Sequence, residues 1–155
     1  MGSFGGFSAA QLKKLQKNLN KLQGQDLDAF MEACAKELAA RLLAKVIKRT
    51  PVGYYPKSSG KKGGTLRRGW TAGKRESAKG YADSLTINHF GNTYVIEIVN
   101  PVEYASYVEY GHRTANHKGW VQGRFMLTIS EQEIQNIAPK VLENKIKKFM
   151  GECLE

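Results

Sequence analysis

The sequence predicts a single α+β domain, in which a small antiparallel sheet containing a β-hairpin packs against long N-terminal and C-terminal helices. Helical spacing of apolar residues runs through the first fifty and the last thirty positions, whereas strict alternation marks residues 84–99. The chain has 155 residues, 41% of them hydrophobic and 25% charged, which suits one globular domain and excludes a disordered or collagen-like chain. We expect a flexible segment at 1–7, the domain at 8–150 and a tail at 151–155.

Two helices are expected before Pro51. In residues 8–23, leucines recur at spacings of three, four and three, with Ser8 as the cap and Gly24 at the end. Asp26 is expected to cap a longer second helix, which Pro51 ends. The apolar face of this second helix consists of Leu27, Phe30, Met31, Cys34, Leu38, Leu42 and Val46.

Three strands are expected in the middle of the chain. The first runs from Leu66 to Lys74 around Trp70, and the other two, at 84–90 and 93–99, form a hairpin through Gly91 and Asn92. The alternation places one set of side chains toward the helices: Leu85, Ile87, Tyr94, Ile96 and Ile98. The following segment is predicted as a helical turn at 104–110 closed by Gly111, and then a loop at 112–123.

Residues 124–150 are predicted to be helical. Ser130 and Glu133 form a capping-box pattern, so this helix begins either at Arg124 or at Ser130. Pro139 is expected to kink or break it, because proline lacks the N–H of a helical hydrogen bond.

The charge is concentrated in one quarter of the chain. The net charge is +10, and residues 38–75 contain eleven of the 24 lysines and arginines and no acidic residue. A loop at 51–64, rich in Gly, Pro, Ser and Lys, lies within this segment. Such a segment attracts phosphates or acidic protein surfaces, although a solvated helix end followed by a basic loop gives the same pattern. The expected partner-binding residues are Lys57, Lys61, Lys62, Arg67 and Arg68.

No set of residues with catalytic spacing is present, so we expect a binding protein rather than an enzyme, with no cofactor. His112 and His117 lack neighbouring cysteines or paired carboxylates, which favours exposed or interface histidines over a metal site. Cys34 and Cys153 are read as a buried thiol and a tail thiol of a reducing compartment rather than a disulfide. We expect neither a membrane-spanning helix nor a secretory signal.

Aromatic residues gather in loops and near strand ends. They either fill the space between sheet and helices or anchor a protein interface, where Tyr and Trp supply contact area at low entropic cost. The expected subunit-interface residues are Tyr104, Tyr107, Glu109, His112, Arg113 and Trp120.

Several of these segments together resemble the gene-ten-type neck proteins of long-tailed bacteriophages, over about residues 26–150. The resemblance lies in Thr50-Pro51-Val52, Thr65-Leu66-Arg67-Arg68 with Trp70, Asn100-Pro101, the run from Tyr104 to Arg113, and Gly123-Arg124-Phe125-Met126-Leu127. The chain departs from the family at residues 54–64, which look like an insertion, and at Gln122, where a proline is usual.

The resemblance implies a structural protein of the virion neck, assembled in the bacterial cytoplasm. Such a protein forms a ring, expected to be a hexamer, at the top of the tail tube, where it joins or completes the tail at the head connector and leaves a lumen for DNA. Two alternatives remain at this stage: a terminator or collar ring of a contractile tail-like particle, and a basic nucleic-acid-binding module without a recognition-helix, sheet or zinc motif.

Overall fold

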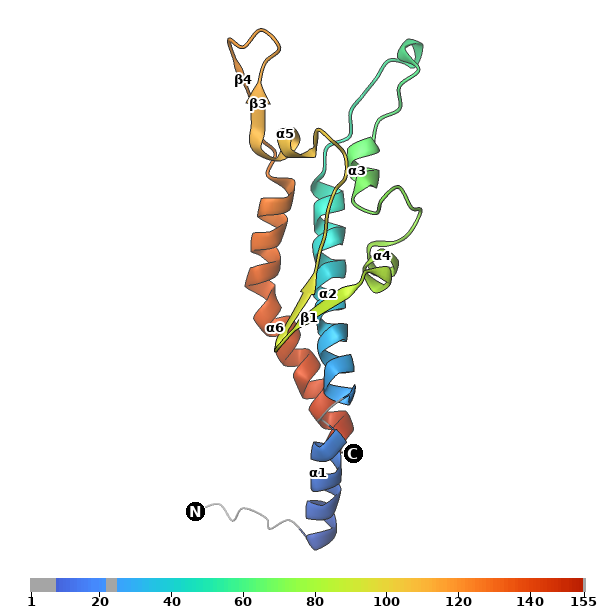
Figure 1. Cartoon of the computed structure of the whole chain (residues 1–155), viewed down its shortest axis with the longest axis vertical. Helices are drawn as coiled ribbons and strands as arrows, with labels where there is room; N and C mark the ends of the chain where they lie inside the picture. Colours follow the sequence, from blue (N-terminus) through green and yellow to red (C-terminus); the bar gives the residue numbers. More distant parts are fainter. Residues whose placement is uncertain (1–7, 22–24, 155) are drawn as a thin grey trace.

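The computed structural model of the chain describes residues 8–21 and 25–154. Two long helices, α2 (Gln25–Arg49) and α6 (Met126–Leu154), lie side by side and form the spine of an elongated molecule (Figure 1). Helix α1 (Ala9–Lys21) extends from one end of this spine and contacts α6. The α+β class predicted from the sequence is confirmed, with several corrections to its elements.

The core lies along one side of α2, near its C-terminal half. Leu43 and Val46 of α2 are fully buried, and Met126 of α6 is buried beside them. Cys34 is a free, buried thiol, and burial raises its pKa. The buried face of α2 is rotated slightly from the predicted apolar face. Ala39 and Leu43, which were not predicted, are buried, whereas Leu27, which was, is exposed.

The predicted β-hairpin is confirmed. Strands β1 (Ile87–Phe90) and β2 (Thr93–Ile96) pair antiparallel, with Phe90 opposite Thr93 across the two-residue turn. The hairpin lies over α2, and Leu85, Ile96 and Ile98 pack against the core. The Tyr94 hydroxyl donates to Asp28 Oδ1 at 2.5 Å, which ties the hairpin to the start of α2 and raises the pKa of Tyr94 to about 12.

The predicted strand from Leu66 to Lys74 is wrong. Residues Thr65–Gly69 form a short helix, α3, and Leu66 and Trp70 are both buried on one side of it. These residues are four positions apart, which is the repeat of a helix face. A second helix, α4 (Ala78–Ser84), was not predicted; the Ser77 hydroxyl caps it by accepting from Gly80 N, and Ala82 packs into the core.

The predicted loop at 112–123 contains a second antiparallel hairpin. Strands β3 (Gly111–Arg113) and β4 (Trp120–Gln122) pair through His112 and Val121, and the turn between them is closed by Thr114 and Gly119. The preceding helix, α5 (Ala105–Tyr110), agrees with the predicted turn that Gly111 closes. The described residues thus contain two separate two-stranded sheets rather than one of three strands.

Helix α6 begins at Met126, so the capping-box start at Ser130 is wrong. Pro139 lies inside the helix, which bends near its middle in Figure 1 and continues past the predicted end at Met150 to Leu154. Helix α2 begins one residue before the predicted cap, Asp26. Residues 1–7, Leu22 and Gly24 lie outside the described residues, as do the side chains of Leu15, Leu19 and Cys153.

Candidate partner-binding surface

Two arms project from the end of the molecule opposite α1 (Figure 1). One is the basic loop, residues 51–64, which contains a single 3₁₀ turn at Lys57–Ser59. The other is the β3–β4 hairpin, residues 111–122. Between their bases lie α3, α5 and the adjacent ends of α2 and α6, so the segments that carry the family resemblance meet at this end.

On the α2 side of this end, Thr50 is hydrogen-bonded to three other residues, Val46, Arg67 and Trp70. It is fully buried, its Oγ1 accepts from Trp70 Nε1 at 2.8 Å, and the same hydroxyl donates to Val46 O at 2.6 Å. Arg67 Nε and Nη2 both donate to the Thr50 carbonyl, at 3.1 and 2.7 Å. The C-terminus of α2, whose last carbonyls have no helical partner, is therefore satisfied by Arg67.

Asn100 joins the strand region to α3. Its Nδ2 donates to Leu66 O at 2.7 Å and its Oδ1 accepts from Val102 N at 3.2 Å. Gly69 packs directly beneath this side chain, since a Cβ there would lie 2.2 Å from Asn100 Oδ1. Only glycine at position 69 leaves room for this contact.

Glu109 holds the N-terminus of α6. Its buried carboxylate accepts from Leu127 N, Thr128 N and Thr128 Oγ1 at 2.9, 2.8 and 2.7 Å. A negative charge is favourable here, because the first N–H groups of a helix are unpaired and its dipole is positive at this end. The chain enters α6 through Phe125, whose φ of +47° is rare for an aromatic residue. We call Thr50, Arg67, Trp70, Asn100 and Glu109 the anchor network.

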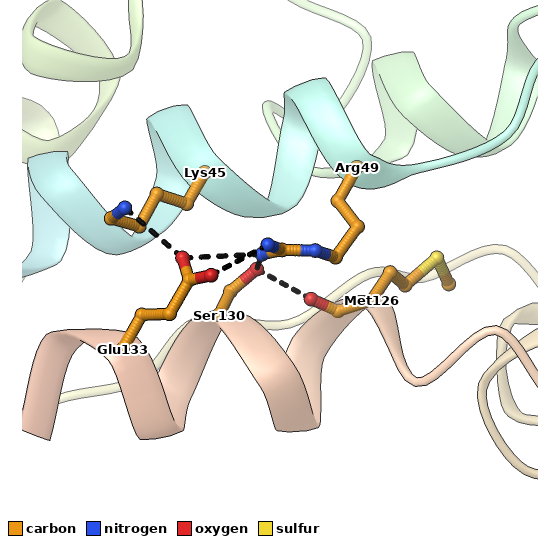
Figure 2. A network of polar contacts seen from close by, with 5 residues as sticks. All are labelled: Lys45, Arg49, Met126, Ser130 and Glu133. Carbon is orange, nitrogen blue, oxygen red and sulfur yellow. Dashed lines mark hydrogen bonds and ion pairs between the residues drawn. The ribbon is translucent and has the colours of Figure 1, made fainter.

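A group of ionic contacts fastens α2 to α6 beside this network (Figure 2). Arg49 Nη2 lies 2.7 Å from Glu133 Oε1, Arg49 Nη1 donates to Ser130 Oγ, and Lys45 Nζ lies 3.0 Å from Glu133 Oε2. Hydrogen bonds from Arg49 and Lys45 lower the pKa of Glu133. Ser130 Oγ also donates to Met126 O within α6. Because Ser130 and Glu133 bind Arg49 of α2, they connect two helices rather than cap one.

The basic residues predicted to bind a partner divide into two groups. Arg67 belongs to the anchor network, and Arg68 Nη1 donates to Gly63 O at 3.1 Å, closing the base of the basic loop. Lys57, Lys61 and Lys62 are exposed, and among the described residues no carboxylate lies within ion-pair distance of them. These three lysines are the available cations of this arm.

The predicted interface residues divide in the same way. Tyr104, Tyr107 and Trp120 expose 44%, 59% and 60% of their surface, and Arg113 is exposed on β3. His112 is half-buried, with its ring 6.0 Å from that of Tyr107. Glu109, in contrast, is buried, and its carboxylate is hydrogen-bonded to the first turn of α6. The arms and the α5 segment between them thus present exposed aromatic and cationic side chains, and buried hydrogen bonds hold the base of the arms.

Clusters of three or more His, Cys, Asp or Glu side chains that could hold a metal are absent from residues 8–21 and 25–154. Within the same residues, no helix has the length and apolar character needed to cross a membrane.

A family model described as "Bacteriophage HK97-gp10, putative tail-component" matches residues 13–111. The chain therefore belongs to the HK97-gp10-like family of phage tail components, a structural family rather than one of enzymes, which confirms the family resemblance of the sequence. Comparison with curated proteins and with solved structures found no match.

Sequence reasoning missed the hydrogen bond between Trp70 and Thr50 and the one from Asn100 to Leu66 O, although all four residues lie in the segments that carry the resemblance. Tyr54, Tyr55 and Tyr110 are among the loop aromatics for which the sequence left core filling and interface anchoring open, and all three are exposed. Tyr54 is 95% exposed, in keeping with its place in the predicted loop at 51–64.

Proposed function

We propose that the chain forms a ring at the top of a phage tail and joins or completes the tail at the head connector. Membership of a family of phage tail components supports this role most directly. The ring, expected to be a hexamer with a lumen through which DNA passes, requires head-to-tail contacts between identical copies that close by rotation.

The observation that carries the proposal is the pair of arms at one end. Exposed tyrosine, tryptophan and arginine side chains are typical of protein interfaces, where these residue types are enriched among the few that dominate the binding free energy. The anchor network holds the base of both arms in place, so little ordering entropy is lost there on binding. Tyr104, Tyr107, His112, Arg113 and Trp120 are the proposed contacts to neighbouring copies.

The basic loop is proposed to contact an acidic face of the neighbouring tail or connector ring rather than the DNA in the lumen. DNA must leave the particle rapidly, and a tight grip by several lysines would oppose its passage. A protein partner of opposite charge uses the same lysines for orientation and specificity.

Electron microscopy of purified particles tests the proposal, because it reports both position and copy number. We expect a ring of several copies between the tail tube and the head connector, with its basic loops directed at a neighbouring ring. A single copy per particle, or density at the distal tip of the tail, would contradict it.

A further inference from the structure

A small cleft lies at the base of the basic loop, between the loop and α5. Its volume is about 220 Å³, and its walls are mostly apolar: Val52, Tyr55, Leu66, Tyr104 and Val108, with Lys62 at its edge. An apolar cavity of about 150 Å³ holds a benzene-sized group, so this cleft has room for one large side chain.

The walls of the cleft are fixed by contacts within the chain. The two limbs of the loop approach so closely at its base that a Cβ on Gly63 would lie 1.9 Å from Gly53 O. Arg68 holds Gly63 from the other side, and Gly64 adopts φ +89°, which favours glycine. The cleft is therefore present before a partner arrives.

The charge around the cleft has one sign. Lys62 lines it, Lys61 Nζ lies 5.9 Å from the centre of the ring of Tyr55, one of its walls, and none of the residues lining the cleft is acidic. Lys57 lies further along the same loop, in its 3₁₀ turn. An apolar cleft within a cationic rim is complementary to an acidic segment that carries a single large apolar side chain.

We propose that this cleft binds an acidic peptide segment of a neighbouring virion protein by inserting one aromatic or aliphatic side chain, while Lys57, Lys61 and Lys62 pair with flanking carboxylates. The inference rests on the proposed function only for the identity of the neighbour. Nucleic acid fits the site less well, because phosphates need only the lysines and bases stack on open aromatic faces, so the concave apolar surface would stay empty.

The experiment uses two capped seven-residue peptides, each of six glutamates around a central residue that is phenylalanine in one and alanine in the other. Titration into the full chain at low salt, followed by NMR chemical shifts, gives both affinities. We expect the phenylalanine peptide to bind at least about tenfold more tightly, since burial of an aromatic side chain contributes more than one factor of ten.

Three variants, each checked for an unchanged melting temperature, locate the site. Lys62→Glu is expected to lower the affinity for both peptides by about tenfold or more. Lys118→Glu makes the same charge change at the tip of the other arm and is expected to keep both affinities within about twofold of the parent chain. Val52→Ser keeps the charge. It is expected to lower the ratio of the phenylalanine-peptide affinity to the alanine-peptide affinity by about threefold or more, because it removes apolar surface from the wall of the cleft.

Equal binding of the two peptides would overturn the inference, because the loop would then bind the glutamates alone and the central side chain would contribute nothing. It would also be overturned if the peptides failed to bind while a twelve-base-pair DNA duplex bound in a Lys62-dependent way, or if Lys62→Glu abolished self-association of the chain without any peptide binding. Electron microscopy of particles tests the ring independently of peptide binding, so the two proposals fail separately.

Discussion

Arg67 and Lys62 lie five residues apart in the same acid-free segment, yet the fold uses them in opposite ways. Arg67 donates two hydrogen bonds to the Thr50 carbonyl at the end of α2, whereas Lys62 is exposed at the edge of a cleft. Glu109 and Tyr107 show the same contrast, two residues apart on α5. The anchor network is therefore assigned to folding stability, and the exposed side chains of the arms and of α5 are assigned to partner binding.

The largest effect is expected at Glu109. Glu109→Ala leaves three donors at the start of α6 without their acceptor, which lowers the free energy of unfolding by about 3 kcal/mol or more. The matched control is Glu103→Ala, an exposed glutamate six residues earlier, with a change within about 0.5 kcal/mol. Urea unfolding measures both, and similar losses for the two variants would refute the capping role.

Thr50 and Trp70 form the next test. Thr50→Val leaves the buried Trp70 Nε1 donor unpaired, at a cost of about 2 kcal/mol. Trp70→Phe removes that donor, so the double variant is expected to lose less than the sum of the two single losses, by about 0.5 kcal/mol or more. Additive losses in a thermodynamic cycle would show that the hydrogen bond contributes nothing.

Alanine variants of Arg67 and Lys62 compare the two regions directly. Arg67→Ala is expected to destabilise the fold by about 1.5 kcal/mol, because the Thr50 carbonyl loses a charged donor, whereas Lys62→Ala changes stability by less than about 0.5 kcal/mol. Chemical unfolding under identical conditions compares them. If Lys62→Ala were the more destabilising variant, the division between the two regions would be wrong.

A smaller effect is expected from pH at Glu133. Its pKa is lowered by Arg49 and Lys45, so the stability that it contributes is present above its unfolded pKa of about 4.3 and disappears as the pH falls through the lower folded value. Glu133→Gln should therefore melt below the parent protein at pH 7, with the difference closing below about pH 4. A difference that persists unchanged at pH 3 would assign it to packing instead.

The β1–β2 hairpin was predictable because its alternation and its Gly91–Asn92 turn are both local signals. The start of α6 was not, because the group that caps it, Glu109, lies 18 residues before Leu127 in the sequence. The strand predicted around Trp70 was wrong for a different reason. The helix that forms there has only five residues, which are too few to separate a period of two from one of 3.6.

The candidate surface was predictable only in outline. The sequence located the basic segment and the aromatic run, but a charge count treats Arg67 and Lys62 alike. What separates them is the position of the Thr50 carbonyl, which comes from the packing of α3 against the end of α2. Tertiary contacts of this kind leave no mark in the composition of a segment.

The most direct test of the division between anchor network and arms replaces Lys57, Lys61 and Lys62 together with serine. The melting temperature should stay nearly unchanged, because exposed charges contribute little to stability. The yield of joined particles should fall, and fall further as salt rises, since the remaining charge pairs are screened. Normal particle yields across the salt series, or a large loss of stability in the triple variant, would contradict the account.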